Sequence, residues 1–205
     1  MTGSIVLYNN EREIILKAIN SFLSSLKVNK LFLIDNSPRN ELENIIIDER
    51  VEYIHNPSNP GFGASHNIAF NRAIEMNSKY HFVINPDIYF VGDVVSQMIN
   101  FMDENVEVGM LMPEILNDDN SVQNLPKLLP SPFSVLLRKL KRPKFIYDDF
   151  INQYELRFVD KKIIYNAPIL SGCFTLFRIN SVKDVGVYDD KFFMYFEDWD
   201  LSRRM

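Results

Sequence analysis

The chain has 205 residues, of which 46% are hydrophobic and 24% charged, values that are ordinary for a soluble globular protein with one sizeable domain. Its net charge of -5 argues against general nucleic-acid binding, so no nucleic-acid partner is expected. The single cysteine, Cys173, excludes an internal disulfide and a cysteine-based zinc site. No secretory leader opens the chain and no apolar run approaches about 18 residues, so a cytoplasmic protein is expected.

The first half of the chain alternates between two hydrophobic periods, one typical of buried strands and one typical of amphipathic helices. Strands are predicted over residues 3–8, 30–34, 51–55, 81–84 and 106–112, and helices over 11–26, 42–46, 68–76 and 93–102. This alternation indicates an α/β fold, in which helices cover both faces of a mainly parallel sheet. Beyond residue 113 we expect a polar loop or hairpin at 117–124, strands at 162–168 and 170–177, and a helix at 181–185.

Three polar turns, at Asn9, Asp35 and Asp87, follow predicted strands. If the connections are right-handed, these turns meet at one edge of the sheet, where open α/β sheets bind their ligands. In the third turn Pro86 ends the strand and places Asp87 just beyond it. One carboxylate beside the Asn85 amide suits a divalent cation that also binds phosphates, and the same residues are equally typical of a plain turn.

Two glycines, Gly61 and Gly63, lie in a loop over residues 56–67 that leads into a predicted helix. Such a turn is typical either of an anion site at a helix N-terminus or of a tight loop that uses glycine for its geometry. The loop has neither the Walker pattern nor the dinucleotide fingerprint.

The C-terminal part carries two further signals. Gly172 interrupts a predicted strand after Ser171, which indicates a bulge or the close approach of a ligand. Glu197 and Asp198 belong to an acidic cluster that follows an aromatic run. The cluster is typical either of a site or of an acidic first turn of a helix.

The segment from Phe133 to Lys144 is basic within an acidic chain. Its apolar residues recur at helical spacing, and it carries no acid but five basic residues, Arg138, Lys139, Lys141, Arg142 and Lys144. This pattern is typical either of a helix lying on an anionic membrane surface or of a core-packed helix whose basic end is solvated.

Taken together, six pieces of the sequence resemble family 2 glycosyltransferases of the GT-A fold, and in particular their rhamnosyltransferase-like branch. The pieces occur in the family's order and span nearly the whole chain, which makes their combination more specific than any one of them. They are Tyr8-Asn9-Asn10, Leu33-Ile34-Asp35-Asn36-Ser37, the loop from Asn59 to Asn67, Ile84-Asn85-Pro86-Asp87, Leu170-Ser171-Gly172-Cys173-Phe174, and the stretch from Phe192 to Leu201.

The resemblance implies transfer of a sugar, with inversion, from a nucleotide-diphosphate donor to a hydroxyl. Asp87 matches the last acid of the family's Asp-x-Asp motif and would hold Mg²⁺ or Mn²⁺ against the diphosphate, although Asn85 replaces the first acid. Asp198 matches the catalytic base, with Glu197 as the alternative, and Asp35 matches the acid that binds the nucleotide base. Donor contacts are also implied for the other matching positions, Tyr8, Asn9, Asn59, Gly61, Phe62, Gly63, Asn67, Asn85, Ser171 and Gly172.

By the same resemblance, residues 1–205 form a single domain, with a nucleotide-binding half at 1–112 and an acceptor-side half at 113–205 that stops short of the family's usual end. The motifs favour dTDP-rhamnose as donor, with other dTDP- or UDP-sugars behind it. The acceptor is expected to be a glycan or lipid-linked glycan of a bacterial cell wall, with peripheral membrane contact through residues 133–144.

Two other classes remain open. A nucleotidyltransferase also uses a doubly wound sheet, but it places a loop rich in glycine and basic residues after the first strand, where this chain has Tyr8-Asn9-Asn10-Glu11. A binding module for nucleotide sugars that has lost its chemistry would explain Asn85 and the short C-terminus.

Overall fold

A computed structural model describes residues 1–45, 47–140, 144–160 and 163–205. The chain divides into two compact units. The sheet unit comprises Met1–Pro113 and Gly172–Met205, and the insert unit comprises Glu114–Ser171. Among the described residues, no helix combines the length and the apolar character that crossing a membrane requires.

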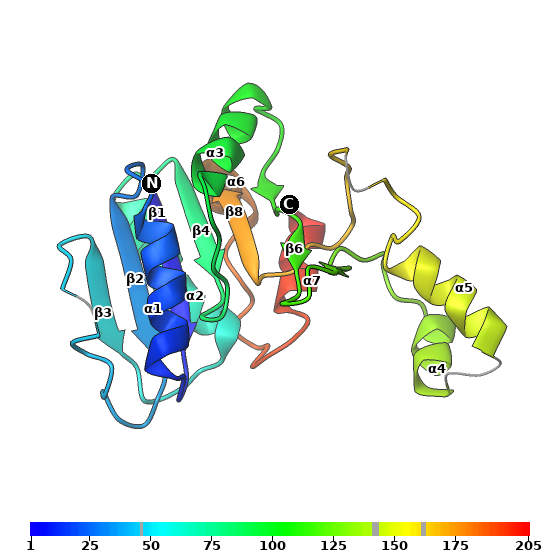
Figure 1. Cartoon of the computed structure of the whole chain (residues 1–205), viewed down its shortest axis with the longest axis horizontal. Coiled ribbons are helices and arrows are strands. Elements are labelled where there is room, and N and C mark those ends of the chain that lie inside the picture. Colours follow the sequence, from blue (N-terminus) through cyan, green and yellow to red (C-terminus); the bar gives the residue numbers. More distant parts are fainter. Residues whose placement is uncertain (46, 141–143, 161–162) are drawn as a thin grey trace. The chain divides into compact units, whose positions relative to one another are not determined.

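The sheet unit is built on a six-stranded sheet with the order β3-β2-β1-β4-β8-β5 (Figure 1). Strands β1, β2, β3 and β4 are parallel to one another, and β8 is antiparallel to both β4 and β5. The mainly parallel α/β sheet expected from the sequence is therefore confirmed. The strands span Thr2–Leu7 (β1), Lys30–Asp35 (β2), Val51–His55 (β3), Tyr80–Ile84 (β4), Met110–Leu111 (β5) and Phe174–Arg178 (β8).

One face of this sheet is covered by α1 (Arg12–Leu23) and α3 (Val94–Glu104). The Phe22 ring of α1 packs edge-to-face on Phe82 of β4, with 5.3 Å between ring centroids. Tyr80 lies on the same side of β4, because successive strand residues alternate between faces, and its hydroxyl donates to Asp103 of α3 at 2.7 Å.

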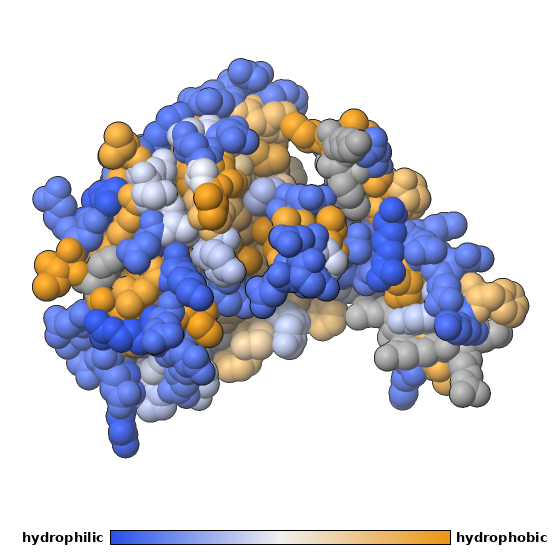
Figure 2. All heavy atoms as spheres, viewed as in Figure 1, coloured by the Kyte–Doolittle hydropathy of each residue, from blue (hydrophilic) through white to orange (hydrophobic). Residues whose placement is uncertain are grey.

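The opposite face is covered by α2 (Phe62–Glu75) and α6 (Ile179–Val185), and α7 (Glu197–Arg204) packs beside them. Phe70 of α2 contacts the rings of His81 and Phe177, which project from neighbouring strands. On the face of the sheet unit seen in Figure 2, polar side chains predominate and apolar ones form small groups between them.

The insert unit contains a short hairpin and two helices. They are β6 (Ile115–Leu116), β7 (Val122–Gln123), α4 (Pro132–Leu140) and α5 (Lys144–Tyr154). Lys127 pairs with Glu155 at 3.2 Å, and the Leu128 N–H donates to the Tyr154 carbonyl, so the strand side of the unit is tied to the end of α5.

Several predicted elements differ from the structure. The predicted helix at 42–46 is wrong for its described residues, which form turns instead. The hydrogen bonds there join residues three positions apart, such as the bond from the Ile45 N–H to the Leu42 carbonyl. No strand occurs in the described part of 162–168, which leaves only the bridge of Ile169 with Lys127. The predicted strand at 106–112 shortens to β5, and the basic segment is divided between α4 and the start of α5, with Lys141 and Arg142 outside the described residues.

Candidate functional site

The polar turns predicted from the sequence all lie at the carboxyl edge of the sheet. Leu7 of β1 pairs with Asp35 of β2, so Asn9 and Asp35 leave the sheet at the same level. Ile84 at the end of β4 pairs with Phe174 at the start of β8. The chain leaves β1 toward β2 on one side, and β4 lies on the other, so the β1–β4 boundary is the topological switch point where such sheets bind ligands.

Asp35 is fully buried and supports the turn that follows it. One carboxylate oxygen accepts the Ser37 backbone N–H at 2.9 Å, and the other accepts the Tyr53 hydroxyl at 2.6 Å. Burial, together with the hydrogen bond to Asp35, raises the pKa of Tyr53, so this phenol stays protonated and keeps donating. The contact of Asp35 with a nucleotide base stays a prediction; in this structure both of its oxygens serve the protein.

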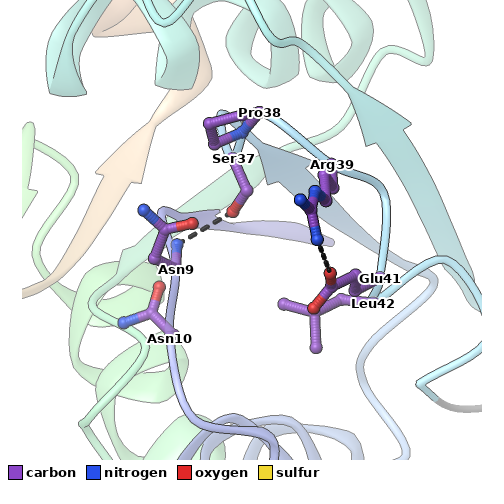
Figure 3. Close-up of a pocket in the computed structure, with 7 residues that line it drawn as sticks. All are labelled: Asn9, Asn10, Ser37, Pro38, Arg39, Glu41 and Leu42. Carbon is purple, nitrogen blue, oxygen red and sulfur yellow. Dashed lines mark hydrogen bonds and ion pairs between the residues drawn. The ribbon is translucent and has the colours of Figure 1, made fainter.

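A pocket of about 240 Å³ opens beside this turn, between the ends of β1 and β2 (Figure 3). Its floor is fixed by a hydrogen bond from the Asn9 N–H to the Ser37 hydroxyl at 2.8 Å, and Arg39 and Glu41 form an exposed ion pair at its side. Of its lining residues the sequence reasoning named only Asn9 as a site residue. The others are Asn10, Ser37, Pro38, Arg39, Glu41 and Leu42.

The glycine loop is docked tightly on the segment that precedes α7. Gly61 has φ +102°, and a Cβ on it would lie 2.0 Å from the Phe193 carbonyl oxygen. That oxygen accepts the Phe62 N–H at 3.0 Å. A Cβ on Gly63 would lie 2.9 Å from Tyr188 and 3.3 Å from Glu197. The two glycines thus allow the loop to pack closely on the segment before α7. Helix α2 begins at Phe62, earlier than the periodicity predicted.

Asn67 holds the same C-terminal segment at a second point. Its side-chain amide donates to the Tyr188 carbonyl at 2.8 Å, and its amide oxygen accepts the Tyr188 N–H at 3.0 Å. Both ends of the amide are therefore occupied by one backbone unit, and the implied contact of Asn67 with the donor remains untested. Tyr188, which sequence reasoning passed over, is almost completely buried against Phe62 and Phe70.

The two candidate carboxyl groups have different surroundings. Glu197 is only 4% exposed, one of its oxygens has no hydrogen-bond partner, and burial, with a smaller effect from the charge of Asp198, raises its pKa. Asp198 is half-buried; burial raises its pKa as well, while hydrogen bonds with the backbone of Gly172 and Trp199 oppose the shift. Asp198 is thus the more accessible of the two acids, and its role as the base stays a prediction.

Asp87 is exposed and lies within a turn closed by the Ile88 N–H, which donates to the Asn85 carbonyl at 3.1 Å. Within the described ranges, no cluster of three or more histidine, cysteine or acidic side chains could hold a metal by itself. One exposed carboxylate still fits Mg²⁺ or Mn²⁺, because such ions keep several waters and take their remaining ligands from a substrate's phosphates. A cation there would depend on the nucleotide that arrives with it.

Two hydrogen bonds bring the segments that carry the two acids together at this edge. The Asn85 N–H donates to the Cys173 carbonyl at 2.7 Å, and the backbone of the neighbouring Gly172 hydrogen-bonds with Asp198. Asp87 lies two residues beyond Asn85. Of the other predicted residues, Tyr8 is half-exposed after β1, Asn59 has φ +43° in the glycine loop, and Ser171 ends the insert unit.

A model of the family described as glycosyl transferase family 2 matches residues 4–186. The chain belongs to this family. The match covers most of β1, the other strands of the sheet unit and the turns at Asn9, Asp35 and Asp87, and it ends before Glu197 and Asp198.

Similar proteins agree with the family and the fold. The low-salt glycan biosynthesis hexosyltransferase Agl10 of Haloferax volcanii is 22% identical over 98% of this chain and 60% of its own length. A mannosyltransferase from Pyrobaculum calidifontis, solved with GDP-Man and Mn²⁺, has a TM-score of 0.60 at 14% identity over 92% of this chain and 47% of its own. GalNAc-T7, solved with UDP, GalNAc and Mn²⁺, has a TM-score of 0.66 at 10% identity over 99% and 40%. The chain therefore has the GT-A glycosyltransferase fold and spans about half of these structures.

Proposed function

We propose that this protein is an inverting glycosyltransferase that moves a hexose from a nucleotide-diphosphate donor to a hydroxyl of a growing glycan. The observation that carries this proposal is the placement of Asp87 and Asp198 at one sheet edge. The contacts of Asn85 with Cys173 and of Gly172 with Asp198 bring the segments that carry the two acids together beside the carboxyl end of β4, in a chain of the matching family.

In this mechanism Asp198 takes the proton of the acceptor hydroxyl while that oxygen attacks the anomeric carbon. The new C–O bond forms on the face opposite the breaking bond to the diphosphate, so the configuration inverts and the nucleoside diphosphate leaves. Burial raises the pKa of Asp198, so its carboxylate is a stronger base than that of an exposed aspartate. Asp87 would hold a divalent cation, which neutralises charge that develops on the diphosphate.

The donor we favour is dTDP-rhamnose, with other dTDP- or UDP-sugars as alternatives. Support comes from the Asn59-Pro-Gly-Phe-Gly63 loop and the stretch from Phe196 to Leu201, which resemble the rhamnosyltransferase-like branch. The mannosyltransferase and GalNAc-T7 were solved with GDP-Man and with UDP, respectively, so a nucleotide panel has to include guanosine as well.

We also propose that the basic segment at 133–144 brings the enzyme to an anionic membrane that carries a lipid-linked cell-wall acceptor. Lys139 and Lys144 are exposed, as are Leu136 and Leu140. Sedimentation with phosphatidylglycerol vesicles should fall when Arg138, Lys139, Lys141 and Arg142 are changed to glutamine. Equal sedimentation of both proteins, or none with either, would dismiss membrane contact.

Turnover of sugar nucleotides tests the chemistry. Wild type should release nucleoside diphosphate from at least one of dTDP-rhamnose, UDP-glucose and GDP-mannose in the presence of Mn²⁺. Asp198→Asn should be slower by roughly 10² to 10⁴ because it lacks the base, and Asp87→Asn should be slower with a changed Mn²⁺ dependence. Asp184→Asn, an exposed acid on α6, is the matched control and should leave turnover unchanged.

Equal turnover in all four proteins would remove both site assignments. Binding of a nucleotide sugar without any turnover by wild type would instead favour the non-catalytic binding module, for which Asn85 in place of the family's first acid is the supporting feature.

A further inference from the structure

Four consecutive large apolar side chains are exposed immediately before the candidate base. Phe193, Met194, Tyr195 and Phe196 are between 50% and 72% exposed. Elsewhere in the described chain, exposed large hydrophobic residues occur singly or as adjacent pairs. Contiguous exposed apolar surface of this kind marks a binding surface more often than isolated residues do. We call residues 193–196 the aromatic loop.

The backbone of the aromatic loop is held in place rather than loose. The Phe193 carbonyl accepts the Phe62 N–H at 3.0 Å and lies directly against Gly61. Tyr195 and Phe196 both have φ +69°, a left-handed conformation that bulky residues rarely adopt. Strained backbone of this kind persists only where surrounding contacts fix it, and it clusters at ligand sites. The exposed rings are therefore presented by a fixed backbone.

The residues that follow the aromatic loop indicate which class of ligand it would bind. Asp198, two residues beyond Phe196, is the group we assign to take a proton from the acceptor hydroxyl, so a molecule resting on the loop lies beside the attacking oxygen. The loop offers aromatic faces and the phenol of Tyr195, and the Asp198 carboxylate follows two residues beyond it. A pyranose ring has matching chemistry, because its C–H face is apolar while its rim carries hydroxyl groups, whereas a lipid tail offers nothing to a carboxylate.

We propose that the aromatic loop binds a pyranose ring of the acceptor, with aromatic side chains against the C–H face of the sugar. This inference rests on the proposed function and extends it, since it assigns acceptor recognition to Phe193, Tyr195 and Phe196. The acceptor then has a sugar, rather than a lipid or a protein side chain, next to the hydroxyl that reacts.

The chain supplies its own reporter for this site. Trp199 is the only tryptophan, and its ring lies edge-to-face on Phe196 with 4.8 Å between centroids. Its fluorescence should therefore change when a sugar occupies the aromatic loop. The probes are the methyl glycosides of rhamnose, mannose, glucose, galactose and N-acetylglucosamine, in the presence of UDP, dTDP or GDP with Mn²⁺. Each glycoside is titrated to about 50 mM, so that binding with a Kd in the millimolar range is detected.

At least one glycoside should change the Trp199 emission of wild type with saturation. Phe193→Ala and Tyr195→Ala should each weaken that Kd at least fivefold. Tyr195→Gly should also weaken glycoside binding, but it should keep or raise the Tm, because glycine adopts the left-handed conformation without strain. If Tyr195 had only a structural role, the Tm and the affinity would fall together. The control Val106→Ala, exposed beside the amino end of β5, should leave the Kd unchanged.

No response to any glycoside, or equal Kd values for wild type and the loop variants, would overturn this inference. Concentration-dependent dimerisation that Tyr195→Ala abolishes would also overturn it, since the surface would then serve a second copy of the chain. The same samples report nucleotide-induced thermal shifts. If wild type shows such a shift but no response to any glycoside, only the role of the aromatic loop is contradicted; if wild type shows neither, the proposed function is contradicted as well.

Discussion

At the scale of single residues, burial separates the roles of two adjacent acids. Glu197 lies under the packed segment beside Gly63, whereas Asp198 reaches the edge of the sheet near Gly172. Sequence alone favoured Asp198 only through its match to the family's acid pair. The structure supplies a physical reason for the same preference, because a base has to meet its substrate.

The fit between Gly61 and the Phe193 carbonyl leads to a prediction on stability and activity. Gly61→Ala should destabilise the protein by about 3 kcal/mol or more, because it combines a left-handed φ with a contact of 2.0 Å to backbone. It should also slow sugar transfer, since the displaced segment carries Asp198. Chemical denaturation and turnover measure the two effects.

Gly92→Ala is the matched control for Gly61→Ala. Gly92 also has positive φ, at +82°, but nothing lies within 4 Å of an added Cβ. Gly92→Ala should lower the free energy of unfolding by only about 1 kcal/mol, which is the cost of a left-handed backbone conformation for a residue with a Cβ. If the two substitutions lower the free energy of unfolding equally, the close packing of Gly61 on Phe193 does not contribute to stability.

Two buried histidines form a network that sequence reasoning did not anticipate. Ser4 links the rings of His66 and His81 at 2.7 and 2.9 Å, and the Thr2 hydroxyl contacts the other nitrogen of His81 at 2.8 Å. Burial lowers the pKa of His81 from 6.5 to about 3 and lowers that of His66 well below its ordinary value. Both rings are therefore neutral in the folded protein.

Acid should destabilise the fold through these rings. Between pH 6.5 and about 3 the unfolded chain protonates a histidine that the folded chain keeps neutral, so stability falls as pH falls. From pH 7 to pH 5 the loss should be about 2 kcal/mol for His81, and His66 should add a loss of the same sign. The raised pKa values of Glu197 and Asp198 act in the opposite direction.

A comparison with His81→Gln isolates the contribution of His81, because glutamine can contact Thr2 and Ser4 without titrating in this range. Urea denaturation of both proteins at pH 7 and pH 5 should show a pH-dependent loss smaller by about 2 kcal/mol in the variant. An identical loss in the two proteins would mean that His81 is already charged in the fold or is not buried.

At the scale of elements, Arg178 ties the end of β8 to the end of α3. Its guanidinium donates to the carbonyls of Val108, Met102 and Asn105 at 2.6 to 3.0 Å and to the Tyr80 hydroxyl at 3.2 Å. The last carbonyls of a helix have no partner within the helix, and a cation there also suits the helix dipole. One side chain thus holds the connection between α3 and β5.

Arg178→Met should lower the free energy of unfolding by about 2 to 4 kcal/mol, because it leaves these carbonyls without their donor. Hydrogen exchange should rise first in α3. Arg72→Met, which removes only an exposed ion pair with Glu75 at 3.5 Å, should cost less than about 1 kcal/mol. Equal costs would show that Arg178 is as dispensable as a surface arginine.

The elements that were predicted well are those with long or fully apolar patterns. The residues of β1, β2 and β4 are almost all buried, and α1 and α3 carry clear apolar stripes. The pattern of apolar residues along the sequence was therefore enough to predict these five elements. Segments such as 42–46 and 162–168 are short, and a few apolar residues fit a helix, a strand or a turn equally well. Tertiary contacts decide such segments.

At the scale of the whole molecule, alternation of strands and helices predicted the parallel sheet and gathered three polar turns at one edge. It did not predict that β8 runs antiparallel between β4 and β5. Nor did it show that Asn67 and the glycine loop hold Tyr188 and Phe193, because these contacts join residues more than 120 positions apart. Residue types at the site were recognised, but the partners of each came only from the fold.

The central claim is that Asp87 binds a nucleotide diphosphate through a cation while Asp198 acts on the acceptor at the same edge of the sheet. The most direct test is the thermal shift caused by UDP, dTDP and GDP, with and without Mn²⁺, in wild type, Asp87→Asn and Asp198→Asn. One diphosphate should raise the Tm of wild type and Asp198→Asn only when Mn²⁺ is present, and Asp87→Asn should lose most of that rise. A Mn²⁺-independent shift that is the same in all three proteins, or no shift with any nucleotide, would contradict the claim.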